Sequence, residues 1–226
     1  MLGIYIGYDP REAVAYHTLA HSILRRSSVP VAIAPLAQNQ LKGIYRRSRG
    51  PTESTEFSLT RFLVPALSEF RGWSIFMDCD MLCRVDIAEL AREIERQPDK
   101  AVLVCKHDYL PKTERKFLDQ IQTKYQRKNW SSLMLFNNER CRALSADYVN
   151  AASGLDLHRF AWMDDGAIGE LPLEWNWLVG EYDYNPAAKI VHFTIGGPYF
   201  EAYRGCDYAE EWFAEYEAIH QSREKR

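Results

Sequence analysis

The first 35 residues carry a strand–helix–strand pattern that restricts the possible folds more than any other part of the chain. Apolar and β-branched residues predict strands over residues 2–6 and 29–35, and apolar residues at helical spacing predict a helix over residues 11–26. Asp9 is a suitable cap for that helix, and Pro10 ends the first strand. Two strands joined by a helix of this length pair in parallel. We therefore predict an α/β protein with a mostly parallel central sheet flanked by helices, a Rossmann-like architecture.

The rest of the chain continues to alternate between predicted strands and helices. Apolar runs predict strands over residues 75–77, 101–105, 133–136 and 190–191, and helical periodicity predicts helices over residues 57–67, 86–96, 143–152 and 207–226. The 226 residues contain no internal repeat, low-complexity segment or linker. The pattern therefore predicts a single domain, with the last helix packed back onto it.

Two carboxylates, Asp78 and Asp80, directly follow the apolar strand predicted at residues 75–77. Residues two apart in an extended chain point to the same side, so both side chains can face one spot beyond the strand end. Open α/β sheets bind ligands at this end of their strands, and paired carboxylates suit Mg²⁺ or Mn²⁺. The alternative is that one Asp caps a helix and the other lies in a solvated loop. Because apolar residues resume at Met81 and Leu82, we favour the metal site.

His192 and Arg61 are candidate partners for a ligand at this end of the sheet. His192 follows the predicted strand 190–191 and precedes a glycine pair, Gly196 and Gly197, whose bare backbone can approach a ligand closely. Although an isolated histidine is usually structural, this setting favours a metal ligand. Arg61 lies among apolar residues, where an arginine usually pairs with an acid or a phosphate, and either acid of the pair is a candidate.

Two polar segments allow both a functional and a structural interpretation. The adjacent carboxylates Asp164 and Asp165 repel each other, so at least one needs a hydrogen-bond or substrate partner. The alternative is an N-cap for a helix that starts near Gly166. The loop over residues 42–56, with arginines within residues 46–49, is either a basic lid that closes over a phosphorylated substrate or a solvated surface loop.

The composition favours a cytoplasmic protein without nucleic-acid partners. A net charge of −3 gives no attraction to nucleic acid or anionic membranes, and no apolar run approaches the roughly 20 residues of a membrane helix. No basic leader precedes the first strand, and the five scattered cysteines do not form a disulfide pattern. We predict a cytoplasmic location with at most peripheral membrane association.

The order of the motifs carries a resemblance to a known family. The motifs are Arg61, Asp78-Cys79-Asp80, Asn129-Trp130-Ser131-Ser132, Asp164-Asp165-Gly166, Leu171-Pro172-Leu173-Glu174-Trp175-Asn176, His192 and Gly196-Gly197-Pro198-Tyr199. In this order they resemble glycosyltransferases of the GT-A fold, nearest to the retaining family 8, which includes glycogenin and lipopolysaccharide galactosyltransferases. The resemblance covers most of the chain. It implies transfer of a sugar from a nucleotide-sugar, with UDP as the expected nucleotide, to a carbohydrate, lipid-linked or protein acceptor.

The resemblance also implies a role for each matching residue. Asp78, Asp80 and His192 would hold Mn²⁺, or Mg²⁺, against the diphosphate. Tyr8 and Asp9 would lie against the uracil and its ribose, Asn129 with Asp164 or Asp165 would hold sugar hydroxyls, and the glycine pair would contact the diphosphate. The implied catalytic residues are Asp78, Asp80, Arg61, Asp164 and Asp165. The implied nucleotide- and donor-binding residues are Gly7, Tyr8, Asp9, Arg61, Cys79, Asn129, Asp164, Asp165, Gly196 and Gly197. On this basis we expect a nucleotide-binding half over about residues 1–105, a sugar and acceptor half over about residues 106–206 and a C-terminal helix over residues 207–226.

Two departures from the family pattern leave other functions open. The family usually has a Lys between the glycine pair and the Pro-aromatic pair, but here Pro198 follows Gly197 directly. Arg204 and the arginines within residues 46–49 are candidates to supply the missing charge. The acidic doublet is followed by Gly166, where Asp-Gln-Asp is common in the family. The alternatives are a non-catalytic nucleotide-sugar-binding protein and a sugar-phosphate nucleotidyltransferase, although no glycine-rich basic motif follows the first strand.

Overall fold

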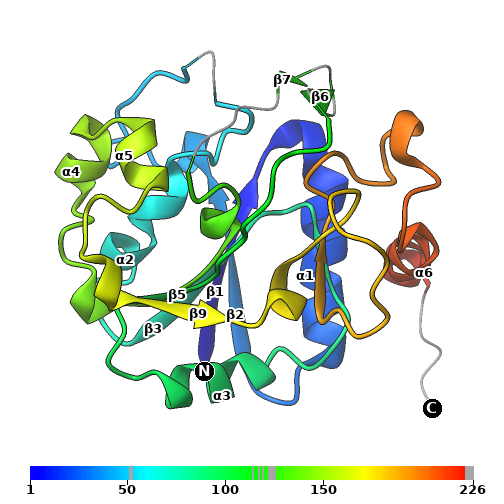
Figure 1. Cartoon of the computed structure of the whole chain (residues 1–226), viewed down its shortest axis with the longest axis horizontal. Helices are drawn as coiled ribbons and strands as arrows, with labels where there is room; N and C mark the ends of the chain where they lie inside the picture. The colour runs from blue at the N-terminus through cyan, green and yellow to red at the C-terminus, as the bar shows by residue number, and fades with distance from the viewer. Residues whose placement is uncertain (51–52, 114, 117, 119, 122–125, 222–226) are drawn as a thin grey trace.

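A six-stranded sheet forms the centre of the protein (Figure 1). The computed structural model describes residues 1–50, 53–113, 115–116, 118, 120–121 and 126–221. In sheet order, the strands are β2 (Val31–Ala37), β1 (Leu2–Tyr8), β3 (Trp73–Met77), β8 (Leu133–Asn137), β5 (Val102–Cys105) and β9 (Ile168–Leu171). Strand β8 runs antiparallel to both of its neighbours, and the other pairs are parallel. The predicted α/β class and mostly parallel sheet are confirmed.

The first strand–helix–strand unit forms as predicted. Strands β1 and β2 pair in parallel from Leu2↔Val31 to Tyr8↔Ala37, and α1 (Ala13–Arg26) connects them. The cap residue Asp9 opens a short 3-10 helix, η1 (Pro10–Glu12), which leads into α1. The second strand lies two residues later than predicted. The reason is local, because the Ser27 hydroxyl donates to the backbone oxygen of Val29 and holds this segment in a turn.

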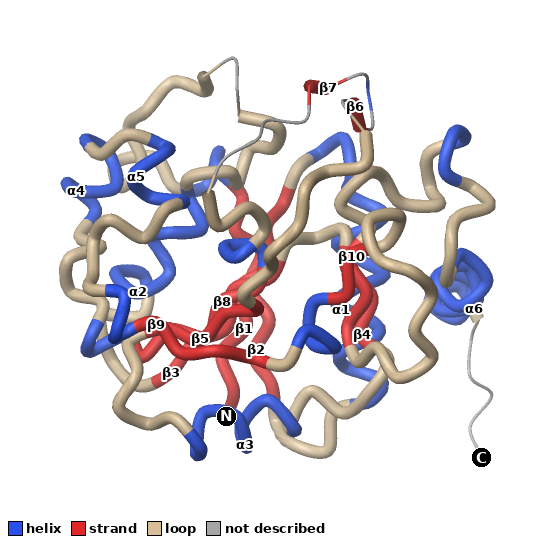
Figure 2. The backbone as a smooth tube through the Cα atoms, in the orientation of Figure 1, coloured by secondary structure: helices blue, strands red, loops and turns tan. Residues whose placement is uncertain are grey.

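A second, smaller sheet stands beside α1 (Figure 2). It contains β10 (Trp177–Leu178), β11 (Ile190–His192) and β4 (Met81–Cys83), in that order. Only residues 78–80 separate the end of β3 in the main sheet from the start of β4 in the small sheet. The acidic pair therefore lies where the chain crosses from one sheet to the other.

The predicted helices form with shifted boundaries. The predicted helix over residues 57–67 is a 3-10 helix, η3 (Thr60–Leu63), followed by one turn of α-helix, α2 (Val64–Leu67). Helices α3 (Glu89–Arg96) and α4 (Ala146–Ala151) lie inside their predicted ranges, and α5 (Gly154–His158) was not predicted. The remaining short elements are η2 (Gln38–Gln40), β6 (Arg115–Lys116), β7 (Gln120–Ile121), η5 (Trp130–Ser132), η6 (Asn138–Arg140), η8 (Leu173–Asn176) and η9 (Glu201–Tyr203).

Strand β9 was missed, and the alternative of a helix starting near Gly166 is met only by a three-residue 3-10 helix without a side-chain cap. A 3-10 turn, η7 (Asp165–Ala167), leads directly into β9, and the side chain of Asp164 makes no capping hydrogen bond. Gly169 lies inside the strand, where an added Cβ would come within 2.4 Å of the Leu103 side chain on β5. A four-residue strand with a central glycine lacks the alternation that identifies strands in a sequence.

The C-terminal helix α6 (Ala209–His220) packs against α1 on the outer side of the small sheet (Figure 1). Its buried Trp212 belongs to an apolar cluster that includes Leu82 of β4 and Val191 of β11. The prediction of a helix that packs back is confirmed over these residues, and residues 222–226 lie outside the described part. No helix in the described residues is long and apolar enough to cross a bilayer. The cytoplasmic location stays a prediction.

Candidate functional site

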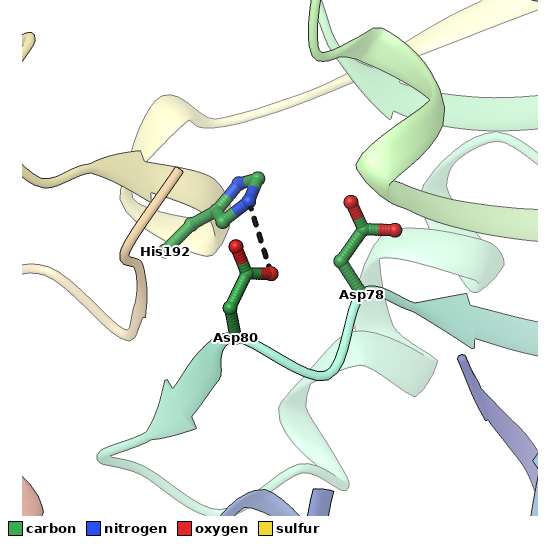
Figure 3. Close-up of side chains that lie close together, drawn as sticks. All are labelled: Asp78, Asp80 and His192. Carbon is green, nitrogen blue, oxygen red and sulfur yellow. Dashed lines mark ion pairs between the residues drawn. The ribbon is translucent and has the colours of Figure 1, made fainter. Parts of the chain in front are cut away.

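Three side chains converge between the two sheets at the carboxyl end of β3 (Figure 3). Asp78 follows the last residue of β3, Asp80 precedes β4, and His192 ends β11. Because β11 pairs with β4 so that His192 lies opposite Met81, the imidazole comes to lie beside Asp80. The ligand atoms offered by the three side chains all lie within 4.8 Å of one another. The fold thus brings the two predicted acids and the predicted histidine into one cluster.

Asn176 fixes the orientation of the His192 ring. The Nδ1 of His192 lies 3.0 Å from Oδ1 of Asn176, while Nδ2 of Asn176 donates to Oγ of Ser132 at 2.8 Å. The amide oxygen therefore accepts from Nδ1, and Nε2, which lies 3.3 Å from Oδ1 of Asp80, is the nitrogen that a metal ion could bind. Two carboxylates and an imidazole are a donor set that fits Mn²⁺. Mg²⁺ prefers oxygen ligands, and the two carboxylates supply these.

Arg61 is buried and forms an ion pair with Asp78, not with Asp80, among the ion pairs of the described residues. Its Nη1 lies 2.8 Å from Oδ1 of Asp78 and donates to the backbone oxygen of Ser131 at 2.8 Å. The guanidinium lies 5.0 Å from the ring centre of Phe76 and 5.4 Å from that of Phe57. An arginine held by two rings and a backbone oxygen has little freedom to move, so it fixes the orientation of the Asp78 carboxylate.

The predicted nucleoside residues Gly7, Tyr8 and Asp9 lie at the carboxyl end of β1, the strand next to β3. Asp9 is buried and accepts hydrogen bonds from the Arg11 side chain at 2.6 and 2.9 Å, and from the backbone N–H groups of Arg11 and Glu56. Burial acts to raise the pKa of Asp9, but these hydrogen bonds outweigh it and hold the pKa below its ordinary value. Asp9 therefore orders the loop after β1, and its contact with a ribose stays a prediction.

At each of the three predicted glycines, an added Cβ would collide with an aromatic ring. The distances are 2.4 Å to Phe57 from Gly7, 2.4 Å to Tyr203 from Gly196 and 2.2 Å to Tyr199 from Gly197. The half-buried Tyr199 in turn donates from its hydroxyl to Oε1 of Glu12 at 2.7 Å. The glycine pair is thus required for packing, and its contact with a diphosphate stays a prediction.

Asn129 and Cys79 lie close to the cluster in different ways. Asn129 adopts a left-handed conformation with φ 63, and its Nδ2 donates to Oη of Tyr109 at 2.8 Å and to Oγ1 of Thr194 at 3.1 Å. Asn129 therefore ties the loop before β8 to the residues after His192.

The Cys79 side chain is fully buried, and burial raises the pKa of its thiol well above the ordinary value. A contact between Cys79 and a nucleotide would have to use the backbone.

Asp164 and Asp165 do not belong to the group of ligand atoms formed by Asp78, Asp80 and His192. They precede the amino end of β9, whereas Asp78 follows the carboxyl end of β3, and these two strands run in the same direction. Both acids are exposed, and Oδ1 of Asp165 pairs with Nη2 of Arg127 at 2.6 Å. Arg127 in turn lies 5.3 Å from the ring centre of Trp130, before the amino end of β8 and so on the same side of the sheet as Asp78. The contact of the doublet with donor hydroxyls stays a prediction.

The arginines considered as substitutes for the missing Lys have partners within the protein, and Arg49 donates to the backbone oxygens of Glu53 and Ser54. Arg46 pairs with Asp147 of α4 at 2.7 Å, and Arg47 donates to backbone oxygens at the end of the same helix. Arg204 lies over the ring of Phe213 on α6, 5.1 Å from its centre. The proposal that the loop acts as a lid stays a prediction, and two of its residues lie outside the described part.

A cleft of about 620 Å³, which was not predicted, lies at the same edge of the large sheet as the cluster. Lys106 and His107, directly after β5, form one wall, and Arg127 and Trp130, before β8, form another. The available signal was positional, because charged and aromatic residues directly follow two predicted strands at the ligand-binding end of the sheet. The sequence did not predict the cleft, because residues 106–109 and residues 126–130 are separate in the sequence.

The fold of this chain is the GT-A fold of solved glycosyltransferases. The bifunctional glycosyltransferase WbbM superimposes with a TM-score of 0.65 at 16% identity, covering 95% of this chain and 49% of that chain, so this chain spans about half of WbbM. The galactosyltransferase LgtC, solved with donor and acceptor sugar analogs, superimposes with a TM-score of 0.61 at 11% identity and covers 99% of this chain and 98% of its own. The glycosyltransferase GlyE of Streptococcus pneumoniae gives a TM-score of 0.57 at 13% identity, covering 95% of this chain and 60% of that chain. These likenesses show the fold.

The sequence itself identifies a closer group. This chain is 46% identical to Protein CDI of Arabidopsis thaliana over 232 residues, which cover 98% of this chain and 88% of that protein. The chain therefore belongs to the family of Protein CDI. No protein-family model matches it.

Proposed function

We propose that this protein is a metal-dependent glycosyltransferase that moves a sugar from a nucleotide-sugar to an acceptor hydroxyl. The observation that supports this most is the convergence of Asp78, Asp80 and His192 within 4.8 Å at the carboxyl end of β3, in a fold shared with glycosyltransferases. UDP as the nucleotide, family 8 as the closer relationship and retention of the anomeric configuration rest on the resemblance of the motifs.

The cluster is the part of the chain that would hold a divalent ion. Asp78, Asp80 and His192 would bind Mn²⁺ or Mg²⁺, which supplies positive charge for a departing diphosphate when it is bound. Arg61 holds Asp78 in one orientation, and Asn176 holds the His192 ring with Nε2 facing inward. Two neighbours thus keep the ligands in place before any substrate arrives, which avoids a reorganisation cost on binding.

The reaction exchanges one bond to the anomeric carbon for another. The acceptor oxygen forms a bond to this carbon while the bond from the carbon to the phosphate oxygen breaks. The electron pair leaves with the nucleoside diphosphate, and the acceptor proton passes to an oxygen of the departing phosphate. Retention requires the acceptor to attack from the face that the diphosphate leaves, so both must occupy the same side of the sugar.

A turnover assay with a panel of UDP-sugars and Mn²⁺ tests the proposal. We expect slow release of UDP by hydrolysis without an acceptor, faster release with the right acceptor, and loss of both in Asp80→Asn, because one of three ligands is removed. Asp99→Asn is the matched control, since Asp99 is an exposed acid far from the cluster in the sequence. Full activity of Asp80→Asn would exclude the metal assignment.

The same assay separates the two alternatives. A nucleotidyltransferase would release pyrophosphate from a nucleoside triphosphate and a sugar phosphate, whereas a glycosyltransferase releases UDP. A non-catalytic nucleotide-sugar-binding protein would bind the donor in an ion-dependent way and release nothing, even by hydrolysis. The structure offers no observation that favours either alternative over transfer.

A further inference from the structure

Two loops adjoin the crossing between the two sheets, residues 78–80. The first, the β1 loop (residues 8–12), continues the strand that pairs with β3 through Ile6↔Met77. The second, the β11 loop (residues 193–203), starts with Phe193, whose backbone N–H donates to the backbone oxygen of Asp80 at 2.8 Å. Two predicted nucleoside residues lie in the β1 loop, and the predicted diphosphate-binding glycines lie in the β11 loop. A nucleotide bound at the cluster would therefore contact both loops.

A hydrogen bond between Tyr199 and Glu12 joins these two loops directly. The Tyr199 hydroxyl, in the β11 loop, donates to Oε1 of Glu12, at the end of the β1 loop, at 2.7 Å. Glu12 is only 1% exposed, and its backbone N–H donates to the backbone oxygen of Asp9 at 2.9 Å. A buried carboxylate is costly unless hydrogen-bond donors reach it, so the contact with the hydroxyl is strongly favoured.

The Tyr199 ring determines where the β11 loop lies. The ring packs against the apolar clusters of both sheets, and its centre lies 5.4 Å from that of Trp212 on α6. It lies so close to Gly197 that a Cβ there would come within 2.2 Å of the ring. The position of the Gly197 backbone therefore follows the position of the ring, which the bond to Glu12 fixes at its far end.

We propose, on the basis of the glycosyltransferase function above, that Glu12 and Tyr199 are positioning residues for the nucleoside diphosphate. Their hydrogen bond holds the β11 loop against the β1 loop, so both loops are in place before the nucleotide arrives. Without the bond, the β11 loop would hold this position for only part of the time, and the apparent Kd would rise in inverse proportion. Arg61 and Asn176 fix the cluster ligands, so the effect should fall on the nucleotide and not on the ion.

Calorimetric titration tests this role. UDP, GDP, CDP and ADP, each with Mn²⁺, are first compared in the wild type to identify the nucleotide that binds. We expect Tyr199→Phe, which removes the hydroxyl, to weaken binding of that nucleotide about tenfold and to leave the affinity for Mn²⁺ alone unchanged. Glu12→Gln keeps an acceptor oxygen and should retain most of the affinity. Tyr208→Phe is the matched control, because the buried Tyr208 also donates from its hydroxyl, to the backbone oxygen of Asn185 at 2.8 Å, and it should bind like the wild type.

Hydrogen exchange of the wild type is a second test that needs no variant. The nucleotide with Mn²⁺ should slow exchange in the β1 loop and the β11 loop together, beyond the effect of Mn²⁺ alone. Protection of one loop without the other would overturn the proposed link.

The titrations separate this inference from the proposed function. The inference alone is overturned if the wild type binds a nucleotide and Tyr199→Phe binds it equally well, or if Tyr208→Phe weakens binding as much as Tyr199→Phe does. It is also overturned if Glu12→Gln loses as much affinity as Tyr199→Phe, because the charge and not the link would then matter. A wild type that binds none of the four nucleotides would count against the proposed function and overturn this inference with it.

Discussion

At the scale of single residues, the site is built from polar side chains that packing has fixed in advance. Arg61 is held by two rings while it pairs with Asp78, and His192 is held by Asn176 while it faces Asp80. Each arrangement buries a polar group that would be unfavourable alone and becomes acceptable through its partner. Such pairs keep the shape of the site but make the folded state sensitive to anything that changes their charge.

His107 should make the stability of the protein fall in mild acid. Burial, together with nearby His192, lowers the pKa of His107 to about 3. In the unfolded chain the pKa of a histidine is about 6.5, so between these values only the unfolded chain binds the proton. The unfolding free energy should therefore fall as the pH is lowered from about 6.5, by up to about 1.4 kcal/mol per pH unit from this residue.

Urea denaturation of His107→Gln at pH values from about 7.5 to about 4.5 measures this contribution. We expect a shallower loss of stability with acid than in the wild type. His17→Gln is the control, because His17 is exposed on α1, and it should follow the wild type. Identical slopes in all three proteins would contradict a neutral, buried His107.

At the scale of elements, α6 supports the site from behind. Trp212 of α6 packs against Tyr199, with ring centres 5.4 Å apart, and Tyr199 lies against Gly197 and bonds to Glu12. Glu215, a buried acid of α6, forms ion pairs with residues of α1. The order of the loop after β11 therefore depends on a helix that contributes no residue to the cluster.

Removing the charge of Glu215 should loosen α6. Its carboxylate pairs with Nη1 of Arg26 at 2.7 Å and with Nδ1 of His21 at 2.5 Å, both on α1. Glu215→Gln replaces charged hydrogen bonds with weaker ones, and we expect a loss of about 1.5–3 kcal/mol. Hydrogen exchange should rise across α6 more than across β1, and Glu217→Gln, at an exposed position of the same helix, should leave both unchanged. Unchanged exchange in Glu215→Gln would show that apolar packing alone holds the helix.

The sequence predicted those elements whose signal is local. The first strand–helix–strand unit has clear periodicity, and the acid pair directly follows an apolar strand, so both were found. Strand β9 was missed because Gly169 interrupts a four-residue strand that pairing with β5 stabilises. The doublet at Asp164 directly precedes that strand, and its predicted contact with donor hydroxyls stays a prediction. The role of Asn176 depends on side-chain geometry that no spacing along the chain encodes.

At the scale of the whole molecule, the ligand cluster joins two sheets. Asp78 continues from the large sheet, whereas Asp80 and His192 belong to the strands of the small one. An ion held by all three would connect the two sheets, and a nucleotide bound to it would add a contact to β1. Because such binding occurs only in the folded state, it must raise the stability of the whole chain.

Thermal unfolding with UDP, GDP, CDP and ADP, each with and without Mn²⁺, measures this coupling. A nucleotide at about 100 times its Kd adds about 2.7 kcal/mol, a midpoint rise of roughly 5–10 °C for a chain of this size. We expect the rise with UDP and Mn²⁺ together, its loss in Asp80→Asn, and its retention in Asp99→Asn, because Asp99 is an exposed acid outside the cluster. A higher unfolding midpoint with another nucleotide and Mn²⁺ would support the metal site and show that the donor carries that nucleotide instead of UDP. An equal rise with UDP in the absence of any divalent ion would show that the nucleotide binds without the cluster, and the three ligands would then need another explanation.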